Sequence, residues 1–248
     1  MSNARINLFW LIIFTLTLPL AVVMSTHLAR KSFERVKLGG QVVTVKGYAE
    51  KPIVSDFGQW SAEIVERHAD RTTAYRQLEE SRAKTLAYLE NKGVPASQVA
   101  LDPVTIRTLH ARDQRGNLLN EIELYVVSQR LGVSSNDVGR VATIARDASI
   151  LIRDNVELVA DSPVYICTKL EDYKIEMLAA ATENARLRAQ QLIAGSQSKL
   201  GSLKTASQGV FQITPAYSTE VSGYGVNDTT SIEKSIKAVV TVEYNIIP

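Results

Sequence analysis

The chain has 248 residues, a formal net charge of +2 and 45% hydrophobic residues. This length is enough for one large domain or two small ones, and the near-zero net charge gives no reason to expect a nucleic-acid partner. The single cysteine, Cys167, cannot form an internal disulfide, and its apolar surroundings in sequence predict a small buried hydrophobe rather than a reactive thiol.

An uncharged apolar run from Leu8 to Met24 marks the start of the chain. At ~1.5 Å per residue a helix over this run reaches roughly 25 Å, which is at the short end for a membrane span. We therefore expect residues 1–37 to be a transmembrane anchor or a signal segment. Val23-Met24-Ser25 is a poor cleavage site, which favours the uncleaved anchor, although a cleaved signal remains the alternative.

The charges flanking this run disagree with an exported body. Arg30, Lys31, Arg35 and Lys37 follow the run, whereas only Arg5 and the terminal amine precede it. The positive-inside rule would keep the richer flank in the cytoplasm. On charge alone, the rest of the chain would face inward.

Alternating β-branched residues predict a strand over 41–48, and a second strand follows over 57–67, with turn residues at Lys51-Pro52 and Asp56 between them. The period then changes to that of a long helix over 70–92, which Asp70 or Thr72 can cap and Gly93 ends. Its expected apolar positions are Tyr75, Leu78, Leu86 and Leu89.

Two strands over 99–109 and 121–133, joined by a polar loop around 113–117, predict a hairpin with a long tip. Ser134 to Asp137 supply caps for a short helix that ends near Asp147. A brief strand over 156–160 comes next.

The longest predicted helix covers 169–194 and ends at Gly195. We expect its inner stripe to consist of Ile175, Leu178, Ala179, Thr182, Ala185, Ala189 and Leu192. A strand over 203–213, a polar loop over 214–235 and an alternating strand over 237–247 complete the chain. The predicted class is α+β, with antiparallel, hairpin-rich sheets packed against two long helices and one short helix.

No catalytic, cofactor or metal site emerges from the motifs. His27, His68 and His110 lie too far apart for metal-ligand spacing. The pattern Ser-x-x-Lys occurs at Ser196–Lys199 and Ser231–Lys234, a spacing that can place a lysine beside a serine nucleophile on a helix, but four-residue patterns of this kind arise by chance.

Two pairs of charged residues share a strand face, and the simplest interpretation of each is a solvated sheet face. These pairs are Glu121 with Glu123 and Glu63 with Arg67. The loop over 214–235 is more unusual, because Tyr217 and Tyr224 lie among small polar residues. Such a composition makes either an adaptable contact surface or a mobile solvated loop.

Several stretches resemble the SIMPL-domain family, which includes bacterial periplasmic immunogenic proteins and predicted oxidative-stress-defence proteins. The similarity covers about 41–248 and is carried by Val43–Glu50 with Lys51-Pro52, Tyr125–Val133, Leu200–Leu203 and Val239–Tyr244. The resemblance implies that residues 38–248 form an α+β domain that is exported or tethered to the membrane and that self-associates. It supplies no catalytic residue.

The leading hypothesis is a non-enzymatic protein of the bacterial inner membrane, with a single pass and its body in the periplasm. We expect it to act through homo-oligomerisation or protein contacts, with a link to stress tolerance that the resemblance alone implies. One alternative is an envelope domain that binds a small ligand or lipid in a groove between sheet and helices. A less favoured alternative is a hydrolase that uses Ser196 or Ser231 with its lysine.

Overall fold

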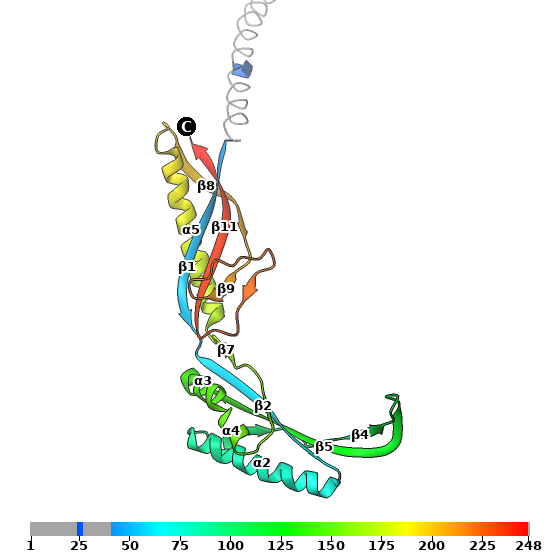
Figure 1. The fold of residues 1–248 in the computed structure, drawn as a ribbon. Coiled ribbons are helices and arrows are strands. Elements are labelled where there is room, and N and C mark those ends of the chain that lie inside the picture. The colour runs from blue at the N-terminus through cyan, green and yellow to red at the C-terminus, as the bar shows by residue number, and fades with distance from the viewer. Residues whose placement is uncertain (1–23, 27–40, 248) are drawn as a thin grey trace, which may run out of the picture. The chain divides into compact units, whose positions relative to one another are not determined.

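The computed structural model describes residues 24–26 and 41–247 (Figure 1). The predicted membrane segment therefore lies almost wholly outside the described residues. No helix among those residues is long and apolar enough to cross a membrane. The chain divides into two compact units: one contains 178–209 and 238–247 with the start of β1, and the other contains 50–177 and 210–237.

The helices are α2 (Arg71–Asn91), α3 (Val138–Asp147), α4 (Ile150–Arg153) and α5 (Leu170–Ile193), with a 3₁₀ turn η1 (Ala96–Gln98). The strands are β1 (Val42–Val54), β2 (Phe57–His68), β3 (Val99–Leu101), β4 (Thr105–Arg112), β5 (Leu118–Ser135), β6 (Leu158–Ala160), β7 (Val164–Ile166), β8 (Lys199–Gln208), β9 (Gln212–Pro215), β10 (Val226–Asn227) and β11 (Glu233–Ile247). The mixed α+β class is confirmed.

Two sheets organise these strands, and every pairing given with its register is antiparallel except that of β9 with β10. The five-stranded sheet has the order β1-β11-β9-β10, with β8 also paired to β11. The six-stranded sheet has the order β3-β5-β2-β6, with β4 paired to β5 and β7 paired to β2. The two long strands β2 and β5 pair from Gly58↔Ser135 to His68↔Tyr125.

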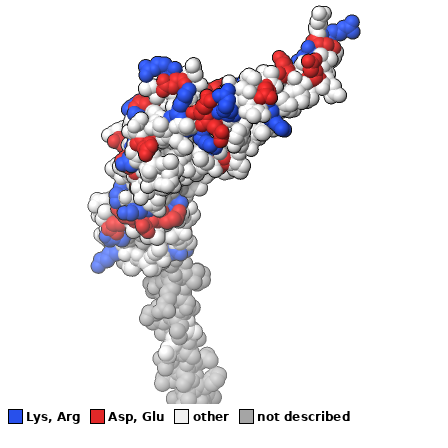
Figure 2. All heavy atoms as spheres, turned by 90° about the horizontal axis from the view of Figure 1, so that it is seen from below, with Lys and Arg blue, Asp and Glu red and all other residues white. Residues whose placement is uncertain are grey.

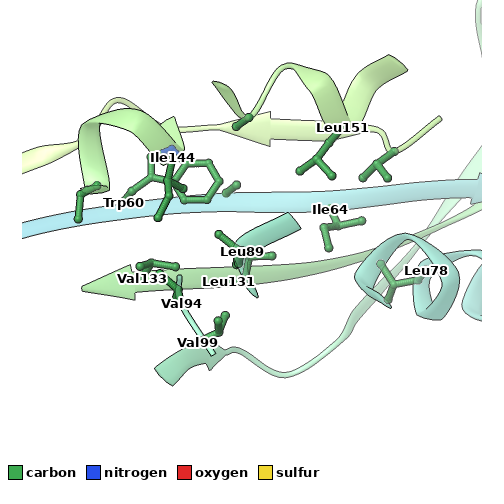
Figure 3. Packing of buried hydrophobic residues seen from close by; sticks show 14 of the residues in the cluster. Trp60, Ile64, Leu78, Leu89, Val94, Val99, Leu131, Val133, Ile144 and Leu151 are labelled. Atoms are coloured by element: carbon green, nitrogen blue, oxygen red, sulfur yellow. The ribbon is translucent and has the colours of Figure 1, made fainter. Parts of the chain in front are cut away.

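The main hydrophobic core lies between the six-stranded sheet and helices α2, α3 and α4 (Figure 3). Ile64, Leu78 and Ile144 are fully buried there. As predicted, Asp70 caps α2, because its carboxylate accepts a 2.8 Å hydrogen bond from the Thr73 amide. Asp137 does the same for α3 through the Arg140 amide at 2.9 Å, so each helix begins where the sequence indicates.

The buried stripe of α2 differs from the prediction. Tyr75 is 41% exposed, whereas Ser81 and Thr85 are buried. Both hydroxyls are satisfied: Ser81 donates to Glu66 at 2.5 Å, and Thr85 donates to the carbonyl of Ser81 at 2.8 Å. Small hydroxyl side chains can therefore occupy core positions when their hydrogen bonds are satisfied, and a pattern of large apolar residues does not reveal them.

The inner stripe predicted for α5 is partly wrong. Its buried residues are Met177, Ala181, Ala185 and Ala189, whereas the predicted Ile175 and Leu192 are 69% and 68% exposed. The reason is a close approach of α5 to β1 at Gly47, where a Cβ would lie 2.7 Å from the Cβ of Ala185. Only alanine fits against that strand, so the buried face follows the small residues rather than the large ones.

Several strand boundaries also differ from the prediction, among them the strand expected over 203–213, which is divided into β8 and β9. The strand expected over 99–109 is split into β3 and β4, because Pro103 lacks the amide that a continuous ladder requires. Lys51-Pro52 lies within β1 instead of a turn, which is possible because β1 is an edge strand. β11 begins at Glu233, within the expected loop, where Ser235 pairs with Thr214 of β9.

Candidate functional site

Neither Ser-x-x-Lys pattern lies on a helix. α5 ends at Ile193, and the Ser196 hydroxyl beyond it donates to the Ile193 carbonyl at 2.7 Å. Ser231 precedes β11, while Lys234 lies within that strand and donates to the carbonyl of Tyr165 at 2.7 Å. The helical geometry on which the hydrolase alternative depended is therefore missing at both places.

Lys234, Tyr165 and Cys167 are buried ionisable groups whose pKa values are shifted. Lys234 is 2% exposed, and burial lowers the pKa of its ammonium group, a shift that the nearby Asp228 opposes. Burial likewise raises the pKa of the Cys167 thiol, which is 8% exposed. Cys167 is thus the small buried hydrophobe that the sequence predicts.

His68 and Arg67, which the sequence drew attention to, make ordinary structural contacts. His68 ends β2, and its Nδ1 accepts a 2.9 Å hydrogen bond from the Asp70 amide. Arg67 forms an ion pair with Glu157, on the strand face opposite the core residue Ile64. Among the residues that the structure describes, no three His, Cys, Asp or Glu side chains are placed to hold a metal ion. His27 lies outside that part of the chain.

One hairpin of the six-stranded sheet, which we call the arm, consists of β4, the turn after it and residues 118–124 of β5. Residues 105–108 of β4 pair with 125–128 of β5 beside β2, and the rest of the arm is a two-stranded extension. Pairing of β5 with β2 ends at Tyr125, so residues 118–124 pair with β4 alone. Figure 1 shows these two strands extending past the end of β2, beyond helix α2 of the same unit.

Large apolar side chains are exposed on both faces of the arm. The exposed fractions are 65% for Leu118 and 41% for Leu119, and Ile106, Leu109 and Ile122 are exposed by 42% to 47%. Ile106 and Leu109 are three residues apart in the regular part of β4 and therefore point to opposite faces. In Figure 2 the arm shows uncharged surface interrupted by residues of both charge signs. Such a concentration of exposed apolar side chains marks a contact surface.

The tip of the arm is an ordered turn. The carboxylate of Asp113 accepts hydrogen bonds from the amides of Arg115 at 2.8 Å and Asn117 at 2.9 Å. Gly116 supplies the positive φ of 83° that the turn requires. Hydrogen bonds from the Asn117 side chain and backbone lower the pKa of the Asp113 carboxyl. These contacts set the register of the hairpin locally, at the end most distant in the ladder from β2.

A second candidate site is a cavity of about 330 Å³ lined by residues of β1, β11 and the loop after β9. Ser235 donates to Glu50 at 2.6 Å at this cavity. Tyr217, also part of its lining, is 98% exposed and adopts a positive φ of 63°, which is uncommon for a residue with a Cβ. Tyr224 in the same loop is fully exposed.

Among the described residues, the geometry offers contact surfaces rather than an arranged nucleophile, base and orienting group. The sequence predicted the hairpin with its long tip and the unusual tyrosine loop, but did not identify the arm as a surface. The available signal was the apolar run of Leu118, Leu119 and Ile122 directly after the polar turn, at the far end of a predicted hairpin.

A family model described as SIMPL, a protein of unknown function (DUF541), matches residues 43–244. No curated protein matches the chain. The match spans both compact units, from β1 to β11, and agrees with the stretches on which the resemblance was based. The chain belongs to the SIMPL family.

Proposed function

We propose that this protein is a non-enzymatic, membrane-tethered envelope protein that acts by self-association through the arm. The observation that carries the proposal is the exposure of large apolar residues on both faces of this hairpin. Five such side chains, from Ile106 to Ile122, have exposed fractions between 41% and 65%. At ~25 cal/mol per Å² of buried apolar surface, covering them would stabilise an assembly appreciably.

The arm also contributes little to the core of its own unit. Of residues 105–124, only His110, Ala111, Asp113 and Leu124 are partly buried, and the others are exposed. A feature that does not stabilise the fold, and that exposes leucine and isoleucine to water, is best explained by a partner that covers it.

The first test is to shorten the arm without disturbing the sheet. Thr108 and Tyr125 are opposite each other in the ladder, so residues 109–124 can be replaced by Asn-Gly to close a two-residue hairpin. We expect the full chain in a mild detergent to be oligomeric by light scattering and the shortened variant to be monomeric, with unchanged helix content by circular dichroism. A monomeric full chain at high concentration would overturn the proposal.

The location is a separate part of the proposal. It is supported by the apolar run 8–24 and by the resemblance to a family that includes periplasmic proteins, and it is opposed by the basic flank that follows the run. A reporter that is active only outside the cytoplasm, fused after Pro248, tests the orientation, and N-terminal sequencing of the same product tests cleavage. An inactive fusion would place the body inside and remove the envelope assignment. The link to stress tolerance rests on the resemblance alone.

A small-ligand function is the second candidate, and the cavity beside Glu50, Ser235 and Tyr217 favours it. A strained backbone at an exposed aromatic residue, beside a mostly apolar cavity with a few polar groups, is typical of ligand sites. Native mass spectrometry of the full chain should then show a bound mass that Ser235→Leu, which fills the cavity wall, abolishes. A spectrum with no bound mass in repeated preparations would contradict this candidate.

A further inference from the structure

The two strands of the arm carry opposite charges. β4 contains Arg107 and Arg112, whereas the free part of β5 contains Glu121 and Glu123. Within the described part of the chain, none of these four residues takes part in an ion pair; the Arg112 guanidinium donates instead to the carbonyl of Gly116 at 2.9 Å. The arm therefore has a basic strand and an acidic strand whose charges are not neutralised by one another.

Both long edges of the arm are open. β4 pairs only with β5, so its far edge makes no ladder with any described strand. Residues 118–124 of β5 pair only with β4, because β2 reaches no further than Tyr125. One hairpin thus presents a basic edge on one side and an acidic edge on the other, each with unpaired backbone groups that can template a strand.

At the edge strand β1, side chains of helix α5 bind backbone groups that no strand pairs with. There the carbonyl of Lys46 accepts a 3.2 Å hydrogen bond from Arg188, and the amide of Tyr48 donates a 3.1 Å hydrogen bond to Asn184. Both partners are side chains of α5. Along β4, by contrast, no described helix supplies such bonds to the backbone of 105–112. The arm therefore has open edges, whereas the edge strand β1 is covered by side chains.

We propose that the β4 edge of one copy pairs in antiparallel fashion with the β5 edge of the next copy, joining successive arms into one continuous sheet. The inference rests on the proposed self-association and names its interface. Aligning the whole free edge of β5, residues 118–124, with residues 106–112 of β4 places Arg107 directly opposite Glu123 of the neighbouring copy. Directly opposed side chains of opposite charge stabilise a sheet.

The charges also disfavour the two symmetric alternatives. If β4 pairs with β4 of a second copy, the only ionisable side chains along the interface are basic: Arg107, His110 and Arg112. If the free part of β5 pairs with that of a second copy, they are all acidic: Glu121 and Glu123. Like charges opposite one another destabilise a sheet. The mixed pairing is head to tail, so it produces a closed ring or an open filament rather than an isolated two-fold dimer.

The test is charge reversal in the full chain, with assembly measured by light scattering and mass photometry. Arg107→Glu and Glu123→Arg should each weaken assembly by about tenfold or more, because every interface then opposes like charges. The double variant should regain assembly, and an equimolar mixture of the two single variants should also do so, since each copy then supplies what the other lacks. Arg115→Glu, at the tip of the turn, is the matched control and should assemble normally.

A disulfide provides an independent readout. In one copy Arg107 is opposite Val126, so residues 107 and 123 are too far apart for a bond within the chain. Arg107→Cys combined with Glu123→Cys should therefore yield ladders of cross-linked chains on oxidation, and the single cysteine variants should not.

The outcomes separate the interface from the function. If the full chain is monomeric, both proposals fail. If the full chain assembles and the shortened arm abolishes assembly, but charge reversal has no effect beyond that of Arg115→Glu, self-association stands and the head-to-tail interface is wrong. If either single reversal assembles as well as the double variant, the proposed register is overturned.

Discussion

Gly47 of β1 lies against the carbonyl oxygen of Ala181 on α5 so closely that a Cβ built at Gly47 would be 2.0 Å from that oxygen. No side chain can occupy this position unless the helix moves. We expect Gly47→Ala to lower the free energy of unfolding by at least about 2 kcal/mol, because overpacking forces the backbone to shift. Chemical denaturation followed by circular dichroism measures the effect. Gly195→Ala, at a glycine with open space around it, is the control and should change stability far less.

The core of the larger unit gives a matched pair of helix substitutions. Leu78 of α2 is fully buried, and Ile175 of α5 is 69% exposed. Leu78→Ala should cost about 2–5 kcal/mol through lost burial and a cavity, whereas Ile175→Ala should stay within about 0.5 kcal/mol. Equal losses in urea denaturation would mean that Ile175 is covered in solution, for instance by another copy.

Asp56 should make stability depend on acid pH. Its carboxylate accepts two hydrogen bonds of 2.7 Å from the amide and hydroxyl of Thr168, and these lower the pKa of Asp56 below the ordinary 3.8. The stabilisation is complete above pH 3.8 and is lost as the pH falls through the lowered pKa of the folded state. Asp56→Ala should lower the free energy of unfolding by about 1–2 kcal/mol at neutral pH, and this difference from wild type should disappear in acid. A difference in stability that stays constant with pH would contradict this assignment.

Lys234 should make stability depend on alkaline pH. Burial lowers the pKa of its ammonium group below the ordinary 10.5, so the folded state releases the proton before the unfolded state does. Stability from this residue therefore rises with pH from the lowered pKa up to about 10.5. Lys234→Met should remove that rise. Thermal unfolding of wild type and Lys234→Met between neutral pH and pH 10 measures this rise. If the unfolding midpoints of the two proteins change with pH in parallel, Lys234 keeps its ordinary titration.

Local signals allowed much of the fold to be predicted. Asp70 and Asp137 cap helices as their side-chain chemistry requires, and the alternating Ala238, Val240, Val242 and Tyr244 are buried on β11. These features depend on residues close in sequence or on a regular period. For the same reason the hairpin around Asp113 was predictable.

Features that depend on distant partners were not predictable. The buried face of α5 is set by Gly47, more than a hundred residues earlier, so the large residues Ile175 and Leu192 gave a wrong stripe. The start of β11 depends on Ser235 finding Thr214 across the ladder. The arm could not be recognised as a surface because the sequence does not reveal where pairing with β2 stops.

The turn at Asp113 has a consequence for the order in which the chain acquires structure. Its hydrogen bonds reach only to Arg115 and Asn117, so the arm closes with contacts between residues a few positions apart. Short loops close fastest and at the least entropic cost, whereas β1 must wait for β11, at the opposite end of the chain. We expect the arm to form while its own unit is still incomplete. Its exposed edges are then present early, so we expect premature contact between nascent chains to be a hazard during synthesis.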